Sequence, residues 1–290
     1  MAIVAQLVRA PVCGTGGRGF EPHRSPQSLP DDAWDILALA PTPTACQSTP
    51  AMHGLANPAR FLRLASWLTP LSLVLGIVLT GLALAWGLEA VPAEKLQGET
   101  VRIMFIHVPA AWLGMAGWMT IAGASIAELV WRHPLAGIAA RAAAPPGAVF
   151  TALCLITGSL WGRPAWGAWW VWDGRLTSML VLLFLYFAYI ALADAASRDN
   201  AGQSRVAAIF GLVGAVNIPI IHYSVLWWNS LHQPPSITMG QSTMAPEFLW
   251  PLLVSTLGFT LILGGVVLAR MRAILADQQA EARLRRKAAA

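Results

Sequence analysis

Six long apolar stretches, separated by shorter segments that carry most of the charge, dominate the pattern of this chain. A membrane-spanning α-helix needs ~20 mostly apolar residues. The stretches that satisfy this requirement are residues 64–87, 103–131, 138–160, 176–194, 206–225 and 248–270. Prolines occur within or at the ends of several of them, which spanning helices tolerate when neighbouring groups satisfy the freed carbonyls. The pattern therefore predicts an all-α polytopic membrane bundle of six transmembrane helices.

The composition agrees with this prediction, because 56% of the 290 residues are hydrophobic and only 11% are charged. An ordinary soluble domain carries about 25% charged residues. The net charge of +5 raises the question of nucleic acid as a partner. The basic residues, however, lie at the ends of the apolar runs, which favours membrane topology and a lipid environment instead. Cys13, Cys46 and Cys154 form no metal-binding or disulfide pattern.

Lys and Arg in the short loops predict the orientation of the bundle. One set of connecting segments carries Arg60, Arg63, Arg132, Arg141, Arg198, Arg205 and the basic residues from Arg270 onward. The other set carries fewer basic residues, and none between Pro219 and Glu247. We therefore expect a multi-pass membrane protein with both termini in the cytoplasm. Segments 161–175 and 226–247 are expected on the outer face.

Residues 1–51 are rich in Pro, Gly, Ser and Thr and contain no apolar core of the kind a secretory signal needs. Gly19-Phe20-Glu21-Pro22 can be encoded by the self-complementary arm of a tRNA gene, and VAQLVRAPVCGTGGRGFEPHRSP resembles such a gene read through as protein. We expect 1–51 to be a mis-called or disordered extension. Residues 52–272 are expected to form the membrane domain, and 273–290 a basic cytoplasmic tail.

The hypothesis for the extension predicts that natively expressed protein begins at Met52. The intact mass of protein expressed from its own upstream sequence is expected to match a start at that methionine. A species whose mass includes Met1 would contradict the hypothesis and favour a disordered tail.

The stretch WGRPAWGAWWVWDGRLT, residues 161–177, concentrates tryptophans on the predicted outer face. Together with the next outer segment it holds half of the chain's 14 tryptophans, namely Trp161, Trp166, Trp169, Trp170, Trp172, Trp227 and Trp228. An interfacial aromatic belt would distribute such residues over both membrane faces. Interspersed glycines let the backbone approach a ligand closely. The segment therefore favours a ligand with a broad π-face and polar edges.

Three histidines, His107, His222 and His232, are predicted at this same level of the membrane. At 1.5 Å per residue, His107 lies ~7 Å below the outer surface. A lone histidine in a span commonly bonds a neighbouring helix, yet ionisable residues in spans often mark a functional site. The spacing lacks an H-x-x-x-H or H-E-x-x-H zinc pattern. Distant single histidines instead suit the two faces of a planar macrocycle.

Charged residues complete the candidate site. Arg102 and Arg175 flank its outer mouth, where each can pair with a carboxylate or anchor the interface. Asp173 can cap the helix that follows it, or orient Arg175 or a tryptophan N–H. The residues together point to heme, with indoles for the ring, histidines for the iron and arginines for the propionates.

The stretch WGRPAWGAWWVWDGRLTSMLVLLFLY resembles the tryptophan-rich WWD signature of heme-handling membrane proteins. With IHVPAAW before it and NIPIIHYSVLWWNSLHQP after it, the chain resembles the cytochrome c maturation protein C family, also called heme exporter protein C, from about Met52 to Arg272. Leu226 departs from the pattern, because a charged residue is expected there.

This resemblance implies a multi-pass protein of the bacterial cell inner membrane whose outer side is periplasmic. It implies a binding protein, not an enzyme, that holds heme b at the periplasmic face and delivers it to a heme chaperone, cytochrome c maturation protein E. The implied partners also include an ATP-binding cassette complex of A and B subunits and a small D subunit. The implied axial ligands of the iron are His107 and His232. The implied heme-binding motif comprises Trp161, Trp166, Trp169, Trp170, Trp172 and Asp173. His222 is then a packing or supporting residue.

Three other classes remain open as alternatives. A bis-histidine electron carrier would shield its heme and exchange electrons quickly. A membrane enzyme would need a convergent acid–base pair, which Asp173 with His222 or His232 could supply. A heme channel would need polar residues down through the spans, whereas their inner halves are almost wholly apolar.

Overall fold

The predicted all-α bundle is confirmed by the computed structural model, which describes residues 57–198, 202–228, 230–233, 236–238 and 241–289. Six of its helical segments are long and apolar enough to cross a membrane, as the sequence predicts. The described residues all belong to one unit, Pro50–Ala290. The expected extension, residues 1–51, lies outside the described part of the chain.

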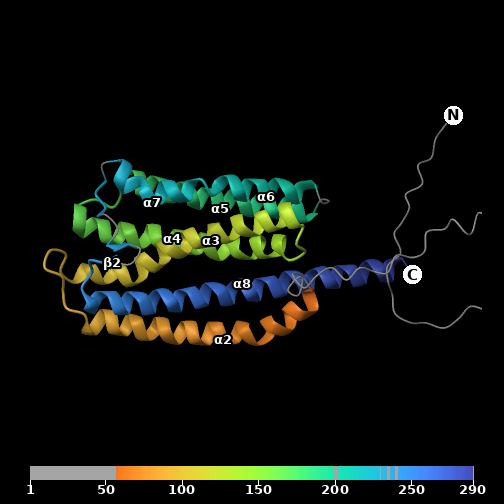
Figure 1. Ribbon diagram of the computed structural model, residues 1–290, viewed down its shortest axis with the longest axis horizontal. Coiled ribbons are helices and arrows are strands. Elements are labelled where there is room, and N and C mark those ends of the chain that lie inside the picture. Colours follow the sequence, from red (N-terminus) through yellow and green to blue (C-terminus); the bar gives the residue numbers. More distant parts are fainter. Residues whose placement is uncertain (1–56, 199–201, 229, 234–235, 239–240, 290) are drawn as a thin grey trace, which may run out of the picture. The chain divides into compact units, whose positions relative to one another are not determined.

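Two closely packed helix pairs organise the bundle (Figure 1). The first pair is α2 (Pro58–Ala85) with α8 (Pro246–Ala288), and the second is α3 (Met104–Trp131) with α4 (Ala136–Trp166). Helix α8 also packs against α3 and α4, so it joins the two pairs. Beyond the second pair lie α5 (Gly174–Arg198), α6 (Gly202–Gly214) and α7 (Asn217–Trp227).

The main core lies among α3, α4, α5 and α6, where Trp118 and Tyr186 are fully buried. The Trp118 indole donates to the Gly211 carbonyl at 3.1 Å, and the Tyr186 hydroxyl donates to the Gly114 carbonyl at 2.7 Å. Both polar groups of these large side chains therefore have partners inside an apolar core, where an unpaired group is costly. By contrast, α2 exposes Val74 and Ile77, among other apolar side chains, on the face that meets lipid.

Small residues let α2 and α8 approach closely, as is common where helices pack within a membrane. A Cβ added at Gly76 would lie 2.9 Å from the Gly258 carbonyl oxygen. A Cβ added at Gly258 would lie 2.4 Å from the Thr80 Oγ1 and 2.7 Å from the Thr80 backbone nitrogen. The backbones are thus too close at this crossing to admit a side chain.

Replacing Gly258 with alanine is expected to lower the melting temperature of the detergent-solubilised protein, because the new methyl group would push α2 and α8 apart. Overpacking of this kind costs about 1–3 kcal/mol. The matched control is Gly264→Ala in the same helix, where a Cβ meets nothing within 4 Å. Equal melting temperatures of the two variants, measured by intrinsic tryptophan fluorescence, would contradict the close-packed crossing.

Helix ends differ from the predicted spans in three places. Helix α4 continues to Trp166, so Trp161 and Trp166 lie in its last turns and not in a loop as predicted. It ends where Gly167 adopts a left-handed φ of 78°, a conformation open to glycine at little cost. Helix α8 continues without a break to Ala288, so the described part of the predicted basic tail, 273–289, is helical almost to its end.

The third difference is in the fifth span, which the structure divides into α6 and α7. Pro219 has no N–H to donate to the carbonyl four residues earlier, and its ring disfavours a straight helix there. The chain turns at Ala215 and Val216 through tighter bonds, Ala215 N–H to Leu212 and Val216 N–H to Val213. The Asn217 side chain donates to the Ser178 carbonyl at 2.9 Å, which holds the break against α5.

The described parts of the α2–α3 and α7–α8 connections contain short elements and local hydrogen bonds. After α2, the π-helical turn Trp86–Ala90 leads to the 3-10 helix Glu99–Ile103. Between them the Glu94 carboxylate accepts the backbone N–H groups of Leu96 and Gln97. Between α7 and α8, the short strands β1 (Ile237–Thr238) and β2 (Gln241–Ser242) pair antiparallel.

Candidate functional site

His107 lies in the first turns of α3 and points toward α4. Its Nδ1 lies 3.0 Å from the Cys154 carbonyl oxygen and 3.1 Å from the Thr157 Oγ1. Because a carbonyl can only accept, Nδ1 carries the proton in this bond. The Nε2 of a neutral His107 is then left with its lone pair, and no hydrogen bond to it occurs among the described residues. A Cβ at Gly158 would lie 3.0 Å from the His107 ring, so this glycine leaves room for the imidazole.

The ring of His232 is oriented in the same way, but by side chains instead of a backbone carbonyl. Its Nδ1 lies 2.9 Å from the Asp173 Oδ2, which also accepts the Ser230 hydroxyl at 2.7 Å. The Ser230 oxygen in turn accepts the His232 backbone N–H at 3.1 Å. A carboxylate accepts only, so Nδ1 of His232 is the donor and Nε2 again holds the free lone pair. Both imidazoles are therefore fixed in the tautomer that offers Nε2 to a metal.

Asp173 has a second role at the start of α5. Its Oδ1 accepts the Leu176 backbone N–H at 2.8 Å, which confirms the predicted helix cap. Burial raises the pKa of Asp173, but the hydrogen bonds from Leu176, Ser230 and His232 outweigh it and hold the pKa below its ordinary value. The carboxylate thus stays ionised at neutral pH and remains an acceptor for His232.

The pKa of His232 is also below its ordinary value, because burial and the nearby Arg175 together disfavour the charged imidazole more strongly than Asp173 favours it. His232 is neutral above its pKa, so the lowered value extends the neutral form to more acidic pH. A neutral imidazole is the form that ligates a metal. Burial therefore keeps this side chain neutral, and the Asp173 carboxylate holds its proton on Nδ1.

The two histidines lie within electrostatic range of each other, although 125 positions separate them in the sequence. Arg175 also acts on both imidazoles and on Asp173. Within the described part of the chain, the partly buried Arg175 guanidinium makes no ion pair closer than 4 Å. A desolvated cation without such a counter-ion favours an anionic group nearby.

The tryptophans divide into those that contact the histidines and those that are exposed. Trp161 meets His107 edge to face, with ring centroids 5.6 Å apart, and Trp166 meets His232 at 4.9 Å. The Trp161 N–H donates to the Gln97 Oε1 at 2.8 Å, which ties the α2–α3 connection to α4. The buried Trp170 N–H has no acceptor among the described residues. Among the seven tryptophans predicted on the outer face, those with at least half of their surface exposed are Trp169, Trp172, Trp227 and Trp228.

Two predicted residues have different surroundings from those expected. Arg102 is engaged within its own connection, since its Nη2 donates to the Val91 carbonyl at 3.0 Å and its Nε lies 2.8 Å from the Glu99 carboxylate. His222 was expected to pack between helices or support the site. Packing between helices is wrong, because its side chain is exposed and its ring meets the adjacent Tyr223. A supporting role at the site stays a prediction.

The sequence reasoning missed the groups that orient the imidazoles. Ser230 stands two residues before His232, a spacing at which a hydroxyl can accept a nearby backbone N–H, but its bond to Asp173 joins positions 57 apart. Thr157 and the Cys154 carbonyl lie on a different helix from His107. No local pattern in the sequence indicates either partner.

The fold and site together define a polytopic helical membrane protein with a tryptophan-rich segment beside two oriented histidines. The family described as heme exporter protein C (CcmC) matches residues 51–286. This chain belongs to that family.

Curated relatives extend the match over most of both chains. A heme exporter protein C of Bradyrhizobium diazoefficiens is 51% identical over 219 residues, which are 75% of this chain and 82% of that protein. The protein of that name in Escherichia coli K12 is 45% identical over 224 residues, covering 77% of this chain and 90% of that protein. That of Paracoccus denitrificans is 37% identical over 234 residues, covering 80% and 96%.

Proposed function

We propose that this protein binds heme b as cargo between His107 and His232 and delivers it to a heme chaperone during the biogenesis of c-type cytochromes. The family and its curated members carry the name heme exporter protein C, which supports a role in heme export. The proposal goes further in assigning the two histidines as axial ligands and in choosing heme b.

The observation that carries the proposal is the tautomer of the two imidazoles. Each Nδ1 donates to a fixed acceptor, the Cys154 carbonyl for His107 and the Asp173 carboxylate for His232. Metal-bound histidines nearly always donate their second ring nitrogen to such a group, which orients the ring and raises its basicity. Two protein ligands suit an iron whose other four positions a porphyrin fills.

The residues around the two histidines suit the porphyrin ring and the propionates of heme. The indoles of Trp161 and Trp166 border the two imidazoles and offer apolar surface to a porphyrin. Arg175 supplies a cation for a propionate, and the unpartnered Trp170 N–H supplies a donor for a polar edge. We assign Arg102 a smaller role in binding the propionates, because it already donates to the Val91 carbonyl and pairs with Glu99.

The same proposal assigns the exposed tryptophans to the delivery step. Trp169 and Trp172 lie between α4 and α5, and Trp227 and Trp228 lie at the end of α7. Aromatic residues are enriched at protein–protein interfaces. We assign this end of the bundle to the periplasm and both termini to the cytoplasm, following the basic residues of the loops. The partners are the chaperone cytochrome c maturation protein E, the A and B export subunits and the small D subunit.

An absorption spectrum of the detergent-purified protein, followed by imidazole titration, tests this function. Bis-histidine ligation predicts a low-spin heme spectrum that free imidazole changes little until it displaces the cargo. Transfer to purified chaperone, measured as heme bound to the chaperone after separation, tests delivery. Purified protein that holds heme but transfers none, while exchanging electrons rapidly in potentiometry, would favour the electron carrier instead.

Replacing Arg175 with glutamine is expected to weaken heme binding about 10- to 150-fold, because a charge-assisted hydrogen bond is worth about 1.5–3 kcal/mol. The matched comparison uses heme dimethyl ester, whose propionates carry no charge. Wild-type protein should bind the ester more weakly than heme, whereas Arg175→Gln should bind the two nearly equally. Lys95→Gln, an exposed change in the α2–α3 connection, is the control. An unchanged preference for free heme in Arg175→Gln would contradict the assignment.

A further inference from the structure

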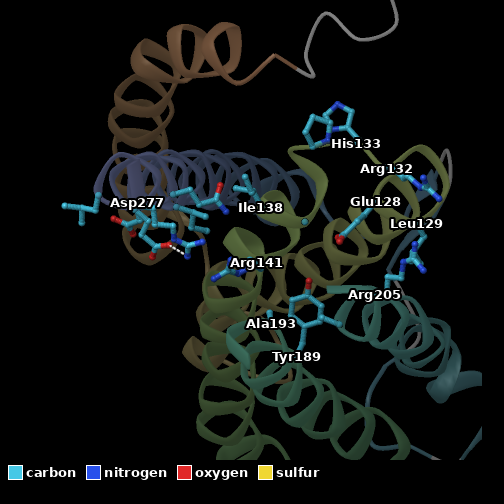
Figure 2. Close-up of a pocket in the computed structure, with 18 residues that line it drawn as sticks. Glu128, Leu129, Arg132, His133, Ile138, Arg141, Tyr189, Ala193, Arg205 and Asp277 are labelled. Carbon is cyan, nitrogen blue, oxygen red and sulfur yellow. Dashed lines mark ion pairs between the residues drawn. The ribbon is translucent and has the colours of Figure 1, made fainter. Parts of the chain in front are cut away.

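A second polar hollow lies at the other end of the bundle from the tryptophan segment. Its lining comes from the end of α3, the start of α4, the end of α5, the start of α6 and the extension of α8. Its volume is about 1380 Å³. Figure 2 shows Glu128, Arg141, Tyr189 and Arg205, each from a different helix, around the same space. Nothing in the proposed heme function uses this hollow.

Arginines supply the distinctive chemistry of its wall. Arg132, Arg141 and Arg205 line the hollow, and none of them makes an ion pair within the described part of the chain. The acidic residues are placed differently. Glu128 has its own interaction and lies against Gly137, and Glu281 pairs with Arg285 at 3.6 Å on α8. Asp277 lies on α8 across the hollow from Arg205 (Figure 2).

A smaller hollow continues the basic surface. It has a volume of about 110 Å³ and shares Arg141, Ala193 and Ile274 with the larger one. Its wall adds Arg270 of α8 and Asp194 of α5, which has an interaction of its own. Arg141 therefore stands between two spaces that each contain a further arginine. This arrangement gives an extended anion more than one cationic contact.

Exposed apolar side chains border the arginines. Val130 and Trp131 directly precede Arg132, and each has 65% of its surface exposed. Val206 directly follows Arg205 and is 54% exposed. Tryptophan is typical of the level of lipid headgroups. Such apolar side chains beside arginines are typical of the level at which lipid phosphates meet the hydrocarbon chains.

We propose that this hollow binds the phosphate group of an anionic phospholipid, with Arg132, Arg141 and Arg205 as its cationic wall. The planar guanidinium matches phosphate oxygens with two parallel hydrogen bonds, so arginine suits this ligand better than lysine. Basic pockets between transmembrane helices are a recurring form of headgroup site. The adjoining apolar surface accommodates the acyl chains, which a soluble phosphate compound lacks.

Native mass spectrometry of the full-length protein, released from detergent with defined lipids, tests the proposal. The lipids are phosphatidylglycerol, cardiolipin and, as zwitterionic comparison, phosphatidylethanolamine. Wild-type protein is expected to retain the two anionic lipids preferentially. Arg141→Gln with Arg205→Gln should reduce that preference roughly tenfold or more, since each basic residue near a lipid surface contributes about 1 kcal/mol.

The matched control is Arg272→Gln with Arg283→Gln, which removes equal charge from α8 outside both hollows. This control should keep the preference, and so should Arg141→Lys with Arg205→Lys to a reduced extent. Equal loss in the pocket and control variants would overturn the site in favour of general charge. Displacement of the lipid by millimolar inorganic phosphate would overturn the lipid as ligand and assign a soluble phosphate compound. The pocket variants and the control variants all keep His107 and His232. A negative result in the lipid experiment therefore says nothing against the proposed heme site.

Discussion

Replacing His107 or His232 with alanine is expected to remove heme from the purified protein. Each variant deletes one Nε2 lone pair and keeps the other, so the iron would lose one of its two proposed protein ligands. Loss of an orienting partner alone typically costs 10- to 100-fold in metal affinity. Loss of the ligand itself should cost at least about 100-fold. The ratio of heme to protein and the Soret absorbance measure the effect, and transfer to the chaperone should fall with them.

His222→Ala is the matched control, because His222 comes from the same end of the bundle and its side chain is exposed. It should retain heme. Added imidazole should partly restore the spectrum of His232→Gly, since a free imidazole can occupy the vacated position. The His107 variant also loses bonds to α4, so its melting temperature shows whether it is folded. Normal heme content in folded alanine variants of both ligands would refute the assignment.

Asp173→Asn is expected to impair heme binding about 10- to 100-fold without removing any proposed ligand. The asparagine amide can present its N–H₂ to His232, whereas the carboxylate only accepts. Nδ1 of His232 would then accept that hydrogen bond and the proton would move to Nε2, which could no longer ligate iron. The same change of tautomer explains the large loss of activity when the aspartate of a serine protease triad becomes asparagine.

Three comparisons separate this effect from loss of the helix cap. Asparagine is as good an N-cap as aspartate, so Asp173→Asn should unfold at nearly the wild-type temperature. Asp173→Ala should lose both the cap and the orientation of His232, and should therefore also be less stable. Ser230→Ala should have a smaller effect on binding, because the direct bond from His232 to Asp173 at 2.9 Å remains. Unchanged heme affinity in Asp173→Asn would show that the tautomer is not controlled by this carboxylate.

The number and class of the spans could be predicted from the sequence because the rule is local. A bilayer requires about 20 apolar residues in a row, and backbone hydrogen bonding within each helix needs no distant partner. The helix ends were harder to predict. Trp161 and Trp166 have the composition of an interfacial loop, yet they complete α4, because the left-handed turn that ends this helix falls at Gly167.

The break in the fifth span could not be predicted from the sequence either. Pro219 is visible in the sequence, but a proline within a span can produce a kink or a complete break. Here α6 ends at Gly214, and Asn217 bonds the Ser178 carbonyl of α5. Whether the chain breaks therefore depends on a neighbouring helix that offers an acceptor.

The sequence alone determined which chemistry the protein carries: six apolar spans, a cluster of tryptophans and isolated histidines at one end of the bundle. Only the tertiary structure decided how the imidazoles are oriented. Asp173 and His232 lie 59 positions apart, and His107 bonds a backbone carbonyl 47 positions away. A carbonyl is present at every residue and leaves no mark in the sequence. The tautomer of a histidine is set by whichever acceptor the folded chain brings to its Nδ1.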